Sequence, residues 1–193
     1  MNSWGLYIRE NIPVLQPLVE QKLDVSLGVI DVKPFPCCID EILDKMRLRS
    51  STSPLHYFWM KYAIGLPVAY LVEFTAATAK AGAATVYYSR HPAWSLQPEP
   101  FKRETVLHEL AHIGHRRIVG GDTGRYPEYV VEGFADLVAI AIESDAGRHY
   151  VRPSYDYAHY RRFMQDLASK EITAFPQMLN YLRSIPKHKN RPR

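Results

Sequence analysis

The segment TVLHELAHIGH, from Thr105 to His115, contains two histidines four residues apart, with a glutamate beside the first. Four residues of an α-helix advance by about 400°, so His108 and His112 point within roughly 40° of each other, one turn apart. Two imidazoles on one rigid turn can bind a single metal ion, and imidazole suits zinc well. Glu109 points about 100° away from His108, where it can reach a water molecule without binding the metal. The segment therefore predicts half of a zinc site, with Glu109 as a general base.

The residues around this motif favour a largely buried helix from Lys102 to about Val119. Burying two histidines and a glutamate is costly unless they have partners, and a bound zinc ion removes most of that cost. The alternative is a helix with two surface histidines and no metal, because a five-residue motif also occurs by chance. The flanking residues carry no charge and favour the metal site: Val106, Leu107, Leu110, Ala111 and Ile113.

A third ligand is needed, and His115 is a poor candidate. His108 and His115 lie about 10 Å apart along a helix axis, whereas a zinc ion lies about 2 Å from each of its ligands. We therefore expect His115 to support the site from outside, to line its wall, or to be partly exposed.

Glu132 is the better candidate for the third ligand, twenty residues after His112. It lies in the otherwise apolar stretch YVVEGFADLVAIAI, where an acid needs a partner. Asp136 follows on the same helical face and could accept the free N–H of a ligand histidine. Gly133 would let a neighbouring helix approach closely. The alternative is that both acids form ordinary ion pairs with nearby arginines, namely Arg116, Arg117 or Arg125.

HELAH followed by EYVVEGFAD resembles the gluzincins, zinc metallopeptidases with H-E-x-x-H and a downstream glutamate on the next helix. The pattern P-x-x-V-x-E-G-x-A is similar to that of their compact members, the peptidase-MA-like proteins or minigluzincins. The resemblance covers about residues 102–143. The resemblance implies hydrolysis of peptide bonds, with His108, His112 and Glu132 as zinc ligands, Glu109 as the base and Asp136 holding a ligand histidine.

The same resemblance implies how a peptide or protein substrate would be bound. An extended substrate would pair antiparallel with the edge strand of a sheet, and AATVYYS (Ala83–Ser89) is the expected edge. Gluzincins also use a tyrosine or histidine to stabilise the oxyanion. Tyr157 and His159 are the best candidates here, with Tyr126 and Tyr129 as alternatives, although aromatic residues at such spacing are more often part of a core.

The rest of the pattern predicts an α+β fold that is zincin-like: a small N-terminal sheet with the active-site helix, followed by a C-terminal helical half. We expect a single domain over residues 1–186, a cleft between the halves near residues 119–126, and a flexible basic tail at 187–193. The expected strands are Val25–Val32, Pro67–Phe74 and Ala83–Ser89, with a short helix or loop between the last two. The expected helices are Trp4–Lys22 (interrupted by Pro13 and Pro17), Cys38–Leu48, Pro127–Glu143, Tyr155–Ser169 and Phe175–Ile185. The pattern of Leu55–Leu66 fits a helix or a strand and favours the helix.

The composition is that of an ordinary globular protein, with 47% hydrophobic and 23% charged residues among 193. The formal net charge of +4 equals the four basic residues of the last seven, KHKNRPR, so we expect no nucleic-acid partner. The N-terminus has no signal-peptide pattern and no run is long enough to span a membrane, which favours the cytoplasm. Cys37 and Cys38 are adjacent and are expected to be reduced.

A second class of function stays open: a non-catalytic zinc-binding or peptide-binding regulatory protein on the same scaffold. Glu109 distinguishes the two classes. A structural zinc site is closed by four protein ligands, whereas this sequence offers three and a base. We expect an endopeptidase-like activity, because no acidic motif that would capture a substrate N-terminus is visible.

Overall fold

The computed structural model describes residues 3–35, 77–148 except 81, 83, 90 and 122, and 157–185. The predictions for Cys37 and Cys38, for the elements expected within residues 38–74 and for the tail at 187–193 lie outside these residues. In chain order the elements are α1 (Ser3–Leu23), β1 (Asp31–Pro34), β2 (Ala77–Lys80), β3 (Thr85–Tyr88), a 3₁₀ turn (Pro92–Trp94), α5 (Glu99–Val119), a second 3₁₀ turn (Thr123–Arg125), α6 (Glu128–Asp145), α7 (Ala158–Ala168) and α8 (Phe175–Ser184).

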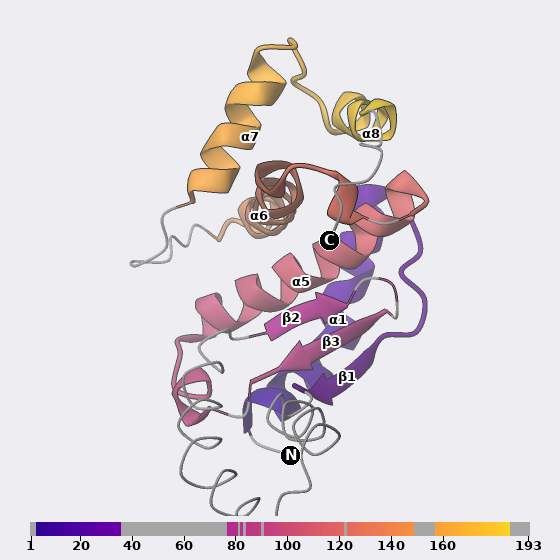
Figure 1. Cartoon of the computed structure of the whole chain (residues 1–193). Coiled ribbons are helices and arrows are strands. Elements are labelled where there is room, and N and C mark those ends of the chain that lie inside the picture. The colour runs from indigo at the N-terminus through magenta and orange to yellow at the C-terminus, as the bar shows by residue number, and fades with distance from the viewer. Residues whose placement is uncertain are drawn as a thin grey trace, which may run out of the picture.

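The fold is α+β, as predicted, and is mostly helical: the described residues form five helices and one three-stranded sheet. In Figure 1 helix α5 lies in the middle, with the sheet and α1 on one side and α6, α7 and α8 on the other. Helix α5 packs against α6, α1, β2 and α8. Within the described ranges, no helix is long and apolar enough to cross a membrane.

Helix α1 is continuous through both of its prolines, so the prediction that Pro13 and Pro17 interrupt it is wrong. Proline removes a backbone donor, and the carbonyl that loses its partner needs another, for which water suffices at the surface. Both prolines lie on the exposed side of the helix. Its buried residues recur every three or four positions and form the opposite face: Trp4, Gly5, Ile8, Ile12, Leu15, Val19 and Leu23.

The sheet has the order β1-β3-β2, with β3 parallel to β1 and antiparallel to β2. The prediction that residues 83–89 form the edge strand is therefore wrong, because β3 lies in the centre. Thr85, Val86 and Tyr88 are buried, as suits a central strand. The link expected to be a helix or loop contains β2, which pairs only with β3 among the described strands and lies beside α5.

The first strand is displaced from its predicted position at residues 25–32 to Asp31–Pro34. Side chains of α1 hold the preceding residues out of the ladder. Glu20 Oε1 accepts a hydrogen bond from the Leu27 amide at 2.7 Å, and Gln16 Nε2 donates to the Gly28 carbonyl at 2.8 Å. Gly28 also has a φ of 76°, which does not continue a strand.

Two helix glycines allow close packing of helices, one within each half. A Cβ on Gly114 of α5 would lie 2.4 Å from Leu23 Cδ1 of α1, and a Cβ on Gly133 of α6 would lie 2.5 Å from the His159 carbonyl oxygen of α7. The close helix approach expected at Gly133 is thus confirmed. The absence of a side chain at these two positions lets α1 and α7 pack directly against the two central helices.

Candidate metal centre

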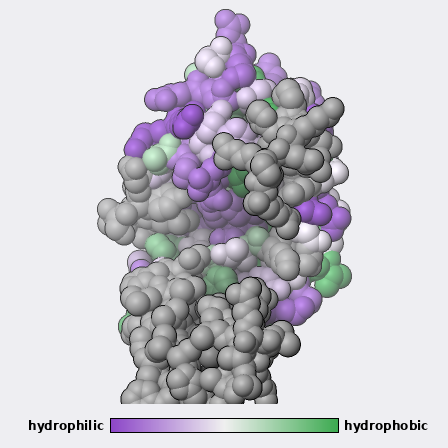
Figure 2. All heavy atoms as spheres, in the orientation of Figure 1, coloured by the Kyte–Doolittle hydropathy of each residue, from purple (hydrophilic) through white to green (hydrophobic). Residues whose placement is uncertain are grey.

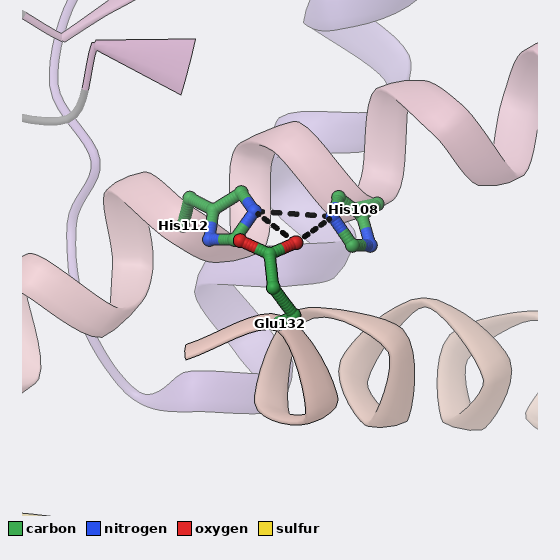
Figure 3. Close-up of side chains that lie close together, drawn as sticks. All are labelled: His108, His112 and Glu132. Carbon is green, nitrogen blue, oxygen red and sulfur yellow. Dashed lines mark hydrogen bonds and ion pairs between the residues drawn. The ribbon is translucent and has the colours of Figure 1, made fainter. Parts of the chain in front are cut away.

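Helix α5 presents His108 and His112 on one face, one turn apart. Their rings are nearly perpendicular, at 85°, and their Nε2 atoms lie 3.0 Å from each other. Both side chains point from α5 toward α6, as Figure 3 shows. Helix geometry alone accounts for this pairing, because residues four apart are neighbours on the helix surface.

Helix α6 brings Glu132 to the same point. Its Oε2 atom lies 3.3 Å from Nε2 of His108 and 3.6 Å from Nε2 of His112 (Figure 3). Ligand atoms about 2.0–2.1 Å from a tetrahedral zinc ion lie about 3.3 Å from one another. The three measured separations lie around this value, and two imidazoles with a carboxylate are a usual donor set for zinc. The residues therefore fit a zinc ion.

Asp136 lies one turn beyond Glu132 on α6 and contacts the other side of the His108 ring. Its Oδ1 atom lies 2.9 Å from His108 Nδ1, and its side chain is fully buried. An Nδ1–H donated to Asp136 leaves the Nε2 lone pair of His108 directed at the candidate site. This is the contact expected of a residue that orients a ligand histidine.

Without a metal, the two carboxylates favour a protonated His108. Burial disfavours the charged ring, but hydrogen bonds to Asp136 and Glu132 outweigh burial and raise the pKa of His108 to about 10. Burial also opposes ionisation of Glu132, but hydrogen bonds to the two histidines lower its pKa well below the usual range. In the metal-free protein, His108 therefore carries a proton at the place where a metal cation would bind.

Glu109 lies on the sheet side of α5, 7% exposed, and does not join the three converging atoms. Its Oε2 atom accepts a hydrogen bond of 2.5 Å from the backbone amide of Ala79 in β2. Ala79 was not predicted to contact the site, because β2 was not expected to be a strand and a backbone donor has no sequence signature. The helix motif and the sheet are thus joined at the residue predicted to be the base.

Tyr157 and His159 lie at the start of α7, and their predicted catalytic roles stay predictions. The Tyr157 hydroxyl donates to Oε1 of the buried Glu104 at 3.0 Å, one turn before His108 on α5. Tyr157 precedes α7 with a φ of 49°, an uncommon conformation for a non-glycine residue. His159 contributes its backbone carbonyl to the close contact with Gly133.

The two alternative tyrosines are engaged elsewhere. Tyr126 is buried, and its hydroxyl donates to the Leu182 carbonyl at 3.3 Å. The ring of Tyr129 lies under the guanidinium of Arg162, 4.3 Å from the ring centre. The first contact is typical of a core residue and the second of a surface cation–π pair.

His115 is fully buried, so the expectation that it could be partly exposed is wrong. Its ring lies between Tyr126 and Phe134, at centre-to-centre distances of 5.3 and 4.8 Å. Neither ring nitrogen has a hydrogen-bond partner among the described residues. Burial and, secondarily, the charge of His112 lower the pKa of His115 to about 3. His115 is therefore a neutral core residue between α5 and α6.

The arginines proposed as alternative partners of Glu132 and Asp136 have other contacts. Arg117 donates to the Leu27 carbonyl at 3.2 Å, and the guanidinium of Arg116 lies against Gly82. The Arg125 side chain lies outside the described residues. The contacts of both acids with His108 favour the metal interpretation over simple ion pairs with arginine.

Hydrophilic residues dominate the described surface toward α7 in the view of Figure 2. Arg161, Arg162 and Gln165 of α7 are exposed. This face of the helical half is therefore typical of contact with water.

Comparison of the chain with protein-family models, with curated proteins and with solved structures finds no match in any of the three.

Proposed function

We propose that the protein is a zinc-dependent metallopeptidase with a zincin-like arrangement of sheet, active-site helix and glutamate helix. The observation that carries the proposal is the convergence of His108 Nε2, His112 Nε2 and Glu132 Oε2, which all lie within 4.8 Å of one another. The buried Asp136 contacts His108 on the side away from the candidate site, and Glu109 is the next residue after His108. Together they supply the orienting carboxylate and the general base that zinc-dependent hydrolysis needs.

A bound zinc ion would supply Lewis acidity, lowering the pKa of a water molecule and polarising the carbonyl of the scissile peptide bond. His108 and His112 would hold it from one turn of α5, and Glu132 from α6. With zinc bound, Asp136 would accept the Nδ1–H of His108 and so leave Nε2 for the metal. Glu109 takes the proton from the attacking water and then passes it to the leaving amine.

The proposed substrate is an extended peptide laid along β2, the outer described strand beside α5, by strand addition. We place the substrate on β2 and no longer on residues 83–89, because β3 already has a strand paired on each side. Tyr157 and His159 stay the proposed oxyanion donors. The hydroxyl of Tyr157 reaches α5 one turn before His108, which supports Tyr157 over His159.

The proposal is tested by hydrolysis of an unstructured protein such as casein by the zinc-loaded wild type and by Glu109→Gln. A glutamine keeps the size of the side chain but cannot take a proton. We expect Glu109→Gln to retain zinc and to lose at least about 100-fold in kcat. A Glu109→Gln variant as active as the wild type would refute the mechanism. A wild type that binds zinc and peptide without cleavage would instead support the non-catalytic regulatory protein.

A further inference from the structure

The hydrogen bond between the Ala79 amide and Glu109 joins two elements that are thirty residues apart in the chain. The Glu109 side chain is nearly buried, so water has limited access to compete for this bond. The donor belongs to the backbone of a strand, and that strand is itself fixed by its pairing with β3. A backbone donor in a paired strand has little freedom to move, unlike a side-chain donor.

The register of the sheet explains why the Ala79 amide is available. Ala79 lies opposite Val86 of β3, and paired residues of an antiparallel ladder alternate between hydrogen-bonded and non-hydrogen-bonded positions. Because the Ala79 amide donates to Glu109, we infer that residue 79 occupies a non-hydrogen-bonded position of the ladder. Its backbone groups therefore face α5, and those of Ala77, two residues earlier, face the same way.

We propose that the backbone amide of Ala79 is a positioning group for Glu109. It holds Oε2 and leaves Oε1 as the oxygen that exchanges protons. A carboxylate fixed at one oxygen has lost most of its rotational freedom before the substrate arrives, which lowers the cost of reaching the reactive geometry. This inference rests on the proposed peptidase function for the role of Glu109, but the hydrogen bond itself does not.

The same contact restricts how a peptide binds to β2. The Ala79 amide donates to Glu109 and is not available to a substrate carbonyl. Ala77 is the remaining described residue of β2 whose backbone faces outward, so a peptide paired with β2 uses Ala77 and the carbonyl of Ala79.

The test replaces one amide by an ester, with lactic acid in place of Ala79, which removes the N–H donor and keeps the side chain. The matched control is the same replacement at Ala77, which has the same side chain and the same strand face. Both esters are made in the wild type and in Glu109→Met, which has no acceptor. Thermal unfolding of the four metal-free ester proteins and their two parents forms a double-mutant cycle.

In the unfolding cycle we expect the ester at residue 79 to lower the midpoint by several degrees with Glu109 present and by much less in Glu109→Met. The ester at residue 77 shifts the midpoint equally in both backgrounds. An ester at residue 79 that has the same effect with and without Glu109 overturns the inference.

The kinetic arm uses zinc-loaded protein and Glu109→Gln, so it does not depend on the folding of Glu109→Met. We expect the ester at residue 79 to lower kcat by about 10-fold or more, with KM changed less than about 2-fold, and to cause no further loss in Glu109→Gln. Coupling in the unfolding cycle together with an unchanged kcat overturns the positioning role. A wild type without any hydrolysis refutes the proposed function, while the unfolding cycle still tests the Ala79–Glu109 bond.

Discussion

Asp136 Oδ1 lies 2.9 Å from Nδ1 of His108, and the Asp136 side chain is fully buried. A buried carboxylate is expensive unless it is paired, and here the pairing fixes which nitrogen of His108 faces Glu132 and His112. The contact therefore links the stability of the core to the orientation of a proposed ligand.

Asp136→Asn is expected to weaken zinc binding about 10- to 100-fold, since it removes the charge that orients His108 without changing the ligands. The affinity is measured by competition with a chromophoric chelator. Glu128→Gln is the matched control, an exposed acid in the first turn of the same helix. Equal affinities of Asp136→Asn and the control would show that Asp136 does not support the metal.

Zinc binding is expected to release about one proton at pH 7. Burial lowers the pKa of His108, but hydrogen bonds to Asp136 and Glu132 outweigh it and raise the value to about 10, so the metal-free ring is charged. Zinc requires a neutral ring, and its apparent affinity should rise about tenfold per pH unit below pH 10. Calorimetry in buffers of different ionisation enthalpy counts the proton, and no release would be inconsistent with His108 as a ligand.

The raised pKa of His108 also makes the metal-free protein less stable in alkali. The folded pKa of about 10 exceeds the ordinary value of 6.5. The resulting stabilisation is fully present below about pH 6.5 and is lost as the pH rises through 10. Urea unfolding of the metal-free wild type and of Asp136→Asn between pH 6 and 10 should show a smaller pH dependence in the variant, whose His108 lacks its strongest charged partner.

His115→Leu is expected to protect the fold against acid. Burial lowers the pKa of His115 to about 3, whereas the unfolded side chain titrates near 6.5, so the unfolded state gains a proton first as the pH falls. This histidine should destabilise the fold by roughly 2 kcal/mol more at pH 5 than at pH 7. Urea unfolding of metal-free protein at both pH values measures the gap between wild type and variant, which should widen in favour of His115→Leu. A constant gap would mean that His115 is not held neutral by the fold.

Gly133→Ala is expected to destabilise the protein more than Gly114→Ala. The new Cβ at residue 133 meets the His159 backbone carbonyl and Phe163 Cβ, neither of which can move without shifting α7. At residue 114 it meets Cδ1 of Leu23, the end of a flexible side chain. We expect a loss of about 1–3 kcal/mol or more at residue 133 and a smaller loss at residue 114, measured by urea unfolding. The reverse order would argue against the close packing of α6 and α7.

The geometry of the site could be predicted where it depends on helix periodicity. His108 and His112 converge because they lie four residues apart on α5, and Glu132 and Asp136 face them because they are polar positions four apart on an apolar helix. Periodicity carried no information about the tertiary contacts of the sheet. The Ala79 amide contacts Glu109 because β2 lies beside α5, and the sequence indicated neither the strand nor its neighbour.

Two predictions, the edge strand at residues 83–89 and the interruption of α1 by prolines, were wrong for a similar physical reason. Segment 83–89 was expected to be an edge because it is the last strand before α5, but pairing with both β1 and β2 makes β3 central. Pro13 and Pro17 were expected to interrupt α1, but both lie on its exposed side, where the freed carbonyls can be solvated. In each case the structure of the segment depends on its tertiary neighbours. The local sequence pattern does not specify these neighbours.

Glu132, one helix away from the histidines, is the proposed third zinc ligand. The most direct test is the zinc affinity of Glu132→Ala beside the wild type and Glu128→Ala, measured by chelator competition on proteins shown to be folded. We expect a loss of more than about 100-fold for Glu132→Ala and no loss for Glu128→Ala, because a ligand contributes more to zinc affinity than the residues that orient it. Undiminished zinc affinity in Glu132→Ala would show that Glu132 is not a zinc ligand.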